Sequence, residues 1–417
     1  MTTLRDRMSG WHALPRDARR LLIVNLLFAL GYNGIGLMLR PLYVLRLGLG
    51  AAHYGMYAAG GSFAYMLASL LAGLLGMRLG ERRTMLVGAF GCLVGTALLP
   101  LTEWLDPRWW APLPIISNVV LSVFWALAIV PMVPALLGIT DESHRDQTIG
   151  LSSTLSGLGI LAGNLIGGLL PRVFSALMGS TQTSNDGFRL AISVALISGI
   201  ALIALLWRVP DGPPVERQVQ VSQAPLRLPV LLLIGTFSML IQTASAAMAT
   251  FSSPYLDQEL HLSTEAIGLV TTLGQALAVF GMGISPWVAR RITSRGGTIV
   301  VGLGASLALL PMAAIPQWLA AVASRIVLGV FNMMRMPLMQ MFAMAQAPQS
   351  RRSLMSGILL TGGGLCLTLV GYLGGLLAAA RGYRAVFWAA AAVTAVATGV
   401  FALVTRALIA RGTLERA

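Results

Sequence analysis

The chain has 417 residues with a formal net charge of +14, and only 11% of its side chains are charged, whereas 56% are hydrophobic. Because soluble domains carry about 25% charged residues, this composition excludes a water-soluble protein and predicts an integral membrane protein in contact with a lipid bilayer. All 29 basic residues are Arg, and the lack of Lys excludes a P-loop nucleotide site and Schiff-base chemistry on a Lys amine.

Apolar stretches of about 20 residues, the length that crosses about 30 Å of hydrocarbon, follow one another along the chain. The first comes after 18 polar, Arg-rich residues and is too long for the apolar part of a cleavable signal, so we expect it to be retained. In chain order, the predicted membrane helices cover residues 19–45, 52–76, 84–103, 111–138, 148–174, 188–208, 228–256, 263–289, 297–315, 317–346, 353–380 and 383–408. Twelve such helices predict an all-α membrane protein.

One long polar stretch separates the sixth predicted helix from the seventh. It contains prolines and charges that cannot continue a helix in lipid. We therefore expect an N-terminal six-helix bundle over 1–208, a cytoplasmic linker over 209–227 and a C-terminal six-helix bundle over 228–417.

The two predicted bundles carry matching residues at constant offsets. At an offset of 213, Pro41 matches Pro254 and Gly55 matches Gly268, and at 207 the run GGLL that starts at Gly167 recurs from Gly374. Parallel half-repeats of this kind are typical of transporters, whose substrate site lies near the membrane midplane between the halves. The repeat predicts two pseudo-symmetric bundles.

The arginines are unevenly distributed between the two sets of loops. With the N-terminus taken as cytoplasmic, 20 Arg lie in the inner segments and six in the outer ones, and positive residues favour the cytoplasmic side. We therefore predict a multi-pass protein of the cell (inner) membrane with both termini in the cytoplasm. Since this distribution accounts for the positive charge, no nucleic-acid partner is expected.

The segment GLLGMRLGERRTML, from Gly73 to Leu86, resembles the signature between helices 2 and 3 of the major facilitator superfamily, roughly G-x-L-x-D-R-x-G-R-R. Gly73, Arg78, Gly80 and Arg82 fall on the pattern, whereas Met77 stands where the family usually has Asp. The resemblance implies the twelve-helix fold of that family and a role for this segment in conformational gating. Met77 removes the acid that helps to lock the two halves together in the family.

A second segment, GILAGNLIGG from residue 159 to 168, is similar to the helix 5 motif described for drug and proton antiporters. Asn164 replaces the Pro of that motif, and Gly159, Gly163 and Gly167 fall four residues apart on one helix face, where they allow close approach of another helix. Two interpretations stay open: a packing face common to the superfamily, and a motif specific to antiport. We assign these four residues to conformational gating as well.

Away from the helix ends, the charged residues inside the predicted helices are all positive: Arg40, Arg325 and Arg335. Arg stays protonated, so it cannot serve as the titrating group of a proton-driven exporter, whereas its planar fork suits carboxylate or phosphate oxygens. We therefore predict an anionic or zwitterionic substrate. Other roles stay open for two of them, since Arg40 could reach the outer surface and Arg325 could hydrogen-bond within the helices.

Polar residues at similar depth complete the predicted substrate site. At 100° per residue, Asn33 shares a helix face with Arg40, and Asn332 shares one with Arg325. A run of methionines around Asn332 suits an amphipathic ligand, although packing also explains it. The predicted substrate-binding residues are Asn33, Arg40, Trp125, Gln242, Gln275, Arg325, Asn332 and Arg335.

These observations predict a secondary active transporter that moves a small, amphipathic or anionic organic solute by alternating access, with export favoured over uptake. The alternative is a proton-coupled multidrug efflux antiporter in which an acid at a helix end, such as Asp257, titrates. No enzyme, metal or cofactor is expected, because the sequence offers no nucleophile with a partnered base, and Cys92 and Cys366 lie far apart in apolar runs. We expect a monomer and leave a coupling ion open.

Overall fold

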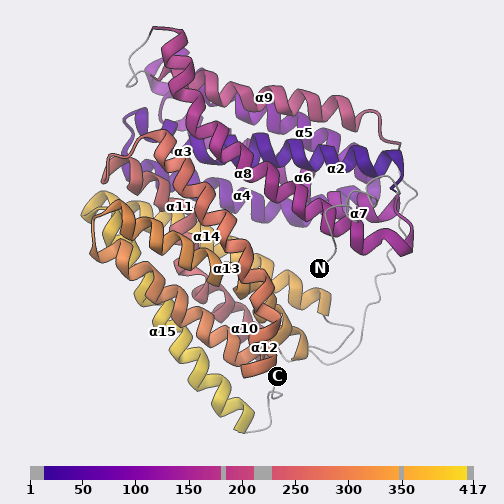
Figure 1. The fold of residues 1–417 in the computed structure, drawn as a ribbon, viewed down its shortest axis with the longest axis vertical. Helices are drawn as coiled ribbons and strands as arrows, with labels where there is room; N and C mark the ends of the chain where they lie inside the picture. Colours follow the sequence, from indigo (N-terminus) through magenta and orange to yellow (C-terminus); the bar gives the residue numbers. More distant parts are fainter. Residues whose placement is uncertain (1–13, 180–184, 211–227, 347–351, 411–417) are drawn as a thin grey trace. The chain divides into compact units, whose positions relative to one another are not determined.

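The computed structural model describes residues 14–179, 185–210, 228–346 and 352–410, and all regular secondary structure in these ranges is helical. From residue 211 on, the predicted linker lies outside them. Figure 1 labels the helices in chain order. In the N-terminal half they are α2 (Arg16–Phe28), the π-helical η1 (Ala29–Gly36), α3 (Leu37–Arg46), α4 (Gly50–Leu79), α5 (Glu81–Leu98), the 3₁₀ turns η2 (Pro100–Trp104) and η3 (Pro107–Trp109), α6 (Pro112–Ile129), α7 (Met132–Gly138), the 3₁₀ turn η4 (Glu142–His144), α8 (Arg145–Leu177) and α9 (Asp186–Leu206).

The C-terminal half contains the remaining long helices. They are α10 (Leu228–Ile241), α11 (Thr243–Gln258), α12 (Thr264–Ala314), α13 (Trp318–Ala345), α14 (Arg352–Arg381) and α15 (Tyr383–Ala410). Every predicted membrane helix has a counterpart in these ranges, and the all-α fold is confirmed. Some boundaries differ in detail. The first, fourth and seventh predicted helices are each divided, and α12 joins the eighth and ninth across non-helical backbone at Ile292 and Thr293.

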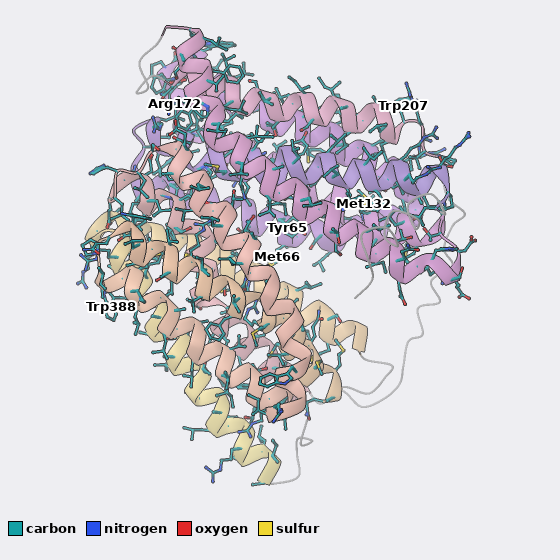
Figure 2. The ribbon with its side chains drawn as sticks, in the orientation of Figure 1. Tyr65, Met66, Met132, Arg172, Trp207 and Trp388 are labelled. Atoms are coloured by element: carbon teal, nitrogen blue, oxygen red, sulfur yellow. The ribbon has the colours of Figure 1, made fainter. Side chains whose placement is uncertain are left out.

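Ten helices of the described part of the chain are long and apolar enough to cross a membrane on their own. Their exteriors carry large apolar side chains: Trp207 is 68% exposed and Trp388 is 49% exposed, and both lie at the edge of the ribbon in Figure 2. A surface of this kind is unfavourable in water and suits contact with lipid tails. The protein is therefore an integral, multi-pass membrane protein.

The chain forms two compact units. Unit 1 comprises Met1–Leu49, Gly60–Arg217 and Thr264–Leu269, and unit 2 comprises Gly50–Ala59, Gln218–Ser263 and Val270–Ala417. Each unit thus includes one short helix end from the other half of the sequence: the start of α12 packs in unit 1, and the start of α4 packs in unit 2.

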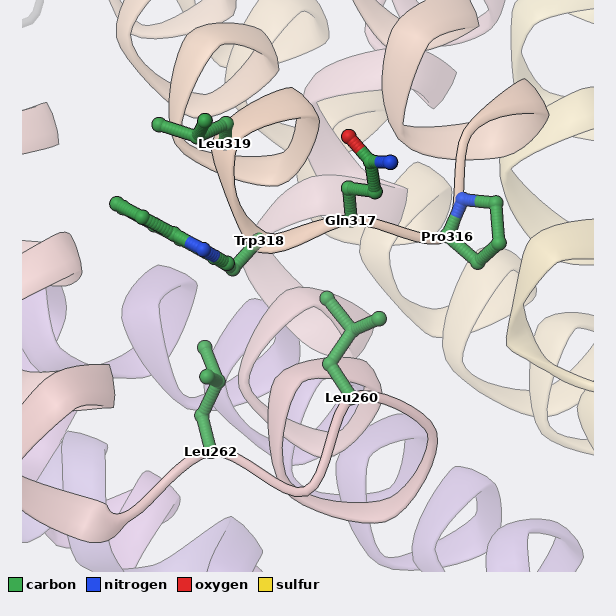
Figure 3. A pocket seen from close by; sticks show the side chains of 6 residues that line it. All are labelled: Leu260, Leu262, Pro316, Gln317, Trp318 and Leu319. Carbon is green, nitrogen blue, oxygen red and sulfur yellow. The ribbon is translucent and has the colours of Figure 1, made fainter.

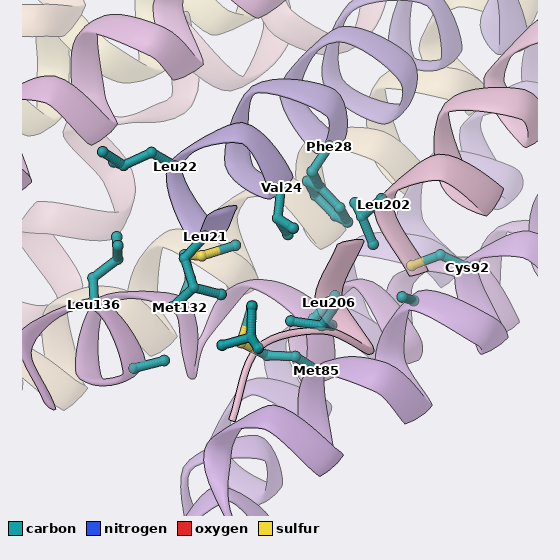
Figure 4. Packing of buried hydrophobic residues seen from close by; sticks show 14 of the residues in the cluster. Leu21, Leu22, Val24, Phe28, Met85, Cys92, Met132, Leu136, Leu202 and Leu206 are labelled. Atoms are coloured by element: carbon teal, nitrogen blue, oxygen red, sulfur yellow. The ribbon is translucent and has the colours of Figure 1, made fainter. Parts of the chain in front are cut away.

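The core of unit 1 forms where α2, α5 and α9 bury apolar side chains, among them Phe28, Met85, Leu202 and Leu206 (Figure 4). The core of unit 2 includes three Phe rings from α10, α13 and α15. The ring centroids of Phe237 and Phe342 lie 5.5 Å and 5.4 Å from that of Phe401, both in edge-on geometry. Such pairs add specific attraction to the burial of the rings.

Equivalent positions of the two halves make equivalent contacts inside their units. A Cβ added to Gly91 on α5 would meet the ring of Phe124 on α6, and one added to Gly304 on α12 would meet the ring of Phe331 on α13. These pairs are related by the offsets of 213 and 207 residues found in the sequence. The predicted pseudo-symmetry is therefore present in side-chain packing as well as in helix order.

Candidate functional site

The first membrane helix of unit 1 is distorted where Asn33 lies. Residues Ala29–Gly36 form a π-helix between α2 and α3, and such segments are frequent at functional sites because they displace side chains from the regular helical positions. The stretch includes three glycines, which weaken regular α-helix. Asn33 is half-buried there.

Arg40 is buried on α3, with 3% of its surface exposed. Its Nη2 donates to Thr96 Oγ1 on α5 at 3.4 Å, and a Cβ at Gly36 would lie 2.5 Å from the same nitrogen. The side chain therefore turns back along its own helix and does not reach the outer surface. Tyr32 and Cys92 lie close enough to Arg40 to interact with its charge.

Trp125 of unit 1 packs against the hydrophobic core. Its ring contacts that of Phe28 edge-on, with the centroids 5.6 Å apart, and the side chain remains half-buried. Its equivalent in unit 2, Asn332, is also half-buried and lies on α13. Each position is therefore half-buried within its own unit.

Arg325 is held inside unit 2 by a neighbouring helix. Its Nη1 donates to Ser252 Oγ on α11, and its Cγ would lie 3.1 Å from a Cβ on Gly274 of α12. Gly329, one turn further along α13, approaches Gly274 and Ala278. Arg325 thus links three helices of unit 2. Gln275, next to Gly274, is exposed.

Arg335 has a different environment, although it too is only 8% exposed. Its Nε is enclosed and has no hydrogen-bond acceptor among the described residues. The Cys366 thiol on α14 lies close enough to interact with its charge, and Cys366 Sγ lies 3.9 Å from Thr243 Oγ1 on α11. Gln242 lies against α14 as well, with Oε1 3.2 Å from the position of a Cβ on Gly363. We name Gln242, Thr243, Arg335 and Cys366 the Arg335 cluster.

The Arg335 cluster lies beside an interruption in the seventh membrane helix. α10 ends at Ile241 and α11 begins at Thr243, and Gln242 between them donates its N–H to Met239 O, one residue short of the regular helical partner. The irregularity is local, because Gln242 keeps an α-helical conformation, Ala246 N donates to Gln242 O at 2.9 Å, and Ala244 N donates to Thr394 Oγ1 at 2.9 Å.

Sequence reasoning missed Thr243 and treated Cys366 as ordinary packing. A signal for Cys366 was present in the repeat. Gly159 of α8 packs against Leu26 and Ala29 of the first membrane helix. By the offsets of 207 and 213, Gly159 corresponds to Cys366 and Ala29 corresponds to Gln242. The repeat therefore relates the contact between α8 and the first membrane helix to the contact of α14 with the helix that contains Gln242.

The segment between α4 and α5 is shaped by Gly80 and Arg82. Gly80 ends α4 with a φ of 88°, a conformation that favours glycine. Arg82 donates to Leu206 O and Trp207 O at the end of α9, at 3.3 Å and 2.7 Å. The corresponding Arg295 of unit 2 donates to Ala402 O and Thr405 Oγ1 on α15. Arg82 therefore stabilises the C-terminus of α9, whereas Arg295 bonds to α15 before its end at Ala410. The other predicted gating residues of this segment are Gly73, which has open space around it, and the exposed Met77 and Arg78.

The glycine face of α8 packs on the first membrane helix. A Cβ would lie 2.8 Å from Leu26 O at Gly159, 2.3 Å from Leu30 O at Gly163 and 3.2 Å from Ile35 Cα at Gly167. Asn164 is 2% exposed. The face thus forms a close helix contact within unit 1.

A pocket of about 280 Å³ opens between two loops of unit 2 (Figure 3). Its lining is largely apolar and consists of Leu260, Leu262, Pro316, Gln317, Trp318 and Leu319. None of these is a predicted site residue.

Two methionines of α13, Met334 and Met339, are buried in core packing, so packing explains this part of the methionine run.

The fold, the paired halves and the interrupted helices define a class, that of twelve-helix membrane transporters. The sequence matches the Major Facilitator Superfamily over residues 21–313 and 231–414. The chain belongs to this superfamily, and it is a membrane transporter rather than an enzyme.

Solved structures with the same fold are distant in sequence. The nucleoside transporter NupG has a TM-score of 0.74 at 14% identity, covering 93% of this chain and 99% of its own. The D-xylose-proton symporter has a TM-score of 0.73 at 15% identity, covering 92% and 96%. A bacterial homolog of the human lysosomal transporter Spinster has a TM-score of 0.73 at 14% identity and covers both chains in full. At these identities the likeness concerns the fold alone.

Proposed function

We propose that this protein is a secondary active transporter for a small organic solute that is anionic or amphipathic, and that it exports this solute as a monomer. The observation that carries the proposal is the sign of the charge at membrane depth, which is positive at Arg40, Arg325 and Arg335. A cationic drug would meet repulsion at these positions, whereas a carboxylate or phosphate would meet a matching charge. NupG and the D-xylose symporter carry small organic solutes on the same fold.

Transport would proceed by alternating access, in which two glycine crossings separate and re-form. Gly375 of α14 lies against the start of α4 in unit 2, since its Cβ would be 2.5 Å from Gly55 Cα. Gly168 of α8 lies against the start of α12 in unit 1, since its Cβ would be 3.3 Å from Gly268 Cα. The glycines let the helix backbones approach closely at each crossing. These pairs, together with the predicted gating residues, are our candidates for the moving contacts.

The alternative function is proton-coupled multidrug efflux, which the similarity of the α8 segment to an antiporter motif favours. It needs an acid that titrates during transport, and Asp257 near the end of α11 is the candidate. A pH gradient would then drive the export of cations.

One experiment separates the two functions. The purified chain is reconstituted into liposomes, and counterflow is measured for octanoate, octylphosphonate and octylammonium, with and without a pH gradient. We expect counterflow of the two anions. Octylammonium transport that requires a pH gradient and is lost in Asp257→Asn, without anion counterflow, would overturn the proposal and establish the alternative.

A further inference from the structure

We infer that the Arg335 cluster is the subsite that binds the head group of the transported solute, and that this head group is an oxyanion, a carboxylate or a phosphoryl group. The inference deepens the proposed function and rests on it only for the claim that the bound solute is carried across the membrane. Binding itself follows from the local structure of unit 2 and is testable without transport.

The three arginines at membrane depth differ in what neighbouring helices offer them. Arg40 donates to Thr96, and Arg325 donates to Ser252. For Arg335, no hydrogen bond and no ion pair is present among the described side chains, and its Nε, like that of Arg40, is enclosed without an acceptor. A guanidinium in that position is unfavourable unless an anion or water completes its surroundings.

The other members of the cluster fit an oxyanion by their donors. The guanidinium can donate two parallel hydrogen bonds to two oxygens of one ligand. The Thr243 hydroxyl and the Gln242 amide can donate to further oxygens. None of the four side chains is a carboxylate, so a cationic head group would find no counter-charge here.

Binding is tested on the purified full chain in a neutral maltoside detergent. The probes share one eight-carbon body and differ in the head group: octanoate, octylphosphonate, octylammonium and octanol. Thermal stability against probe concentration gives an apparent Kd. We expect the two anions to raise Tm, and octylammonium and octanol to raise it much less at the same concentrations.

The variants are Arg335→Gln, Arg335→Lys and the control Arg381→Gln. The control removes one positive charge from the same unit at an exposed position at the end of α14. We expect Arg335→Gln to weaken octanoate binding at least about 30-fold, as the loss of hydrogen bonds to a charged group implies. Arg335→Lys should bind octanoate more tightly than Arg335→Gln but more weakly than the wild type, because an ammonium keeps the charge and cannot donate two parallel bonds. Arg381→Gln should bind octanoate as the wild type does. Equal binding by Arg335→Gln and Arg381→Gln overturns the subsite.

A second measurement keeps the test decisive if Arg335→Gln does not fold. In the Cys92→Ser background, Cys366 is the one remaining cysteine of the chain. It is only 2% exposed, so its rate of alkylation by N-ethylmaleimide reports how readily the cluster opens. Saturating octanoate should slow this alkylation several-fold, whereas octylammonium should not. Unchanged alkylation in octanoate overturns the subsite.

The oxyanion that binds the Arg335 cluster could belong to a lipid or to a soluble molecule. Alkylation of Cys366 is therefore compared in nanodiscs of phosphatidylcholine alone and with phosphatidylglycerol. Protection by phosphatidylglycerol assigns the subsite to a lipid head group, and protection by octanoate alone assigns it to a soluble anion. If octanoate binds through Arg335 but no probe shows counterflow, the proposed function fails while the subsite stands.

Discussion

Hydroxyl groups on neighbouring helices hold two of the three arginines that lie at membrane depth. Arg325 illustrates the principle, since the hydroxyl of Ser252, itself 1% exposed, accepts from its guanidinium. In lipid, where water cannot replace a lost partner, a single hydroxyl can decide whether a charged side chain is tolerated.

Ser252→Ala tests this dependence. The substitution removes the acceptor and leaves the guanidinium of Arg325 enclosed, so we expect a loss of stability of about 1–3 kcal/mol. Ser253→Ala is the matched control, because Ser253 is the next residue and is half-buried without a described hydrogen bond. Unfolding of the purified variants by heat or denaturant measures both. Equal stability of the two variants would show that Arg325 does not rely on Ser252.

At the scale of helices, glycine determines how closely two membrane helices can approach. α8 carries glycines that contact the first membrane helix through backbone atoms, and Gly163 is the tightest of them, with a Cβ position 2.3 Å from Leu30 O. Without a hydrophobic driving force between helices in lipid, such close packing supplies much of the association.

Gly163→Ala should therefore separate α8 from η1 and destabilise unit 1 by about 1–3 kcal/mol, the usual effect of overpacking. Gly157→Ala on the same helix has no neighbour within 4 Å, and should be neutral or stabilising by up to about 1 kcal/mol, because Ala favours helix over Gly. Thermal unfolding of both variants gives the comparison. A fully stable Gly163→Ala protein would contradict the assigned packing.

At the scale of the whole molecule, the two sequence halves repeat their contacts. The starts of α4 and α12, related by the offset of 213 residues, each cross a glycine pair, at Gly375 and at Gly168 respectively. In a transporter that alternates between two states, contacts made by equivalent elements are candidates to open together.

Gly375→Ala should weaken its crossing, because the new methyl group would lie 2.5 Å from Gly55 Cα. A reporter cysteine at Ala59, which is 6% exposed, should then be labelled faster in a background without Cys92 and Cys366. Gly399→Ala on α15, which has open space, is the control and should leave the rate unchanged. If Gly375→Ala leaves it unchanged as well, this crossing does not open during transport.

The predicted orientation rests on the 20 inner and six outer arginines. Cysteines introduced between residues 211 and 226, in place of the polar linker residues, should be labelled by a membrane-impermeant reagent only in inverted membrane vesicles. Cysteines placed between 47 and 49 should be labelled only in intact cells. The reverse pattern would place both termini outside.

The sequence by itself determined the membrane class, the helix order and the repeat. Each membrane helix must satisfy its own backbone hydrogen bonds in lipid, so local composition predicts where a helix begins and ends. The last helix illustrates this, since it is predicted at 383–408 and found at Tyr383–Ala410. The exceptions are segments in which a helix departs from regularity: no local pattern predicted the π-helix at Ala29–Gly36 or the interruption at Gln242.

Only the tertiary structure decided what each buried arginine contacts. Helix periodicity places Arg325 and Arg335 on one helix, about 80° apart around its axis. It could not reveal that Ser252 contacts Arg325, or that Cys366 and Thr243 lie beside Arg335. Those neighbours come from other helices, and their rotation and depth depend on glycine contacts distributed over the whole unit. The partner of a buried charge is therefore a property of helix packing, which no single segment encodes.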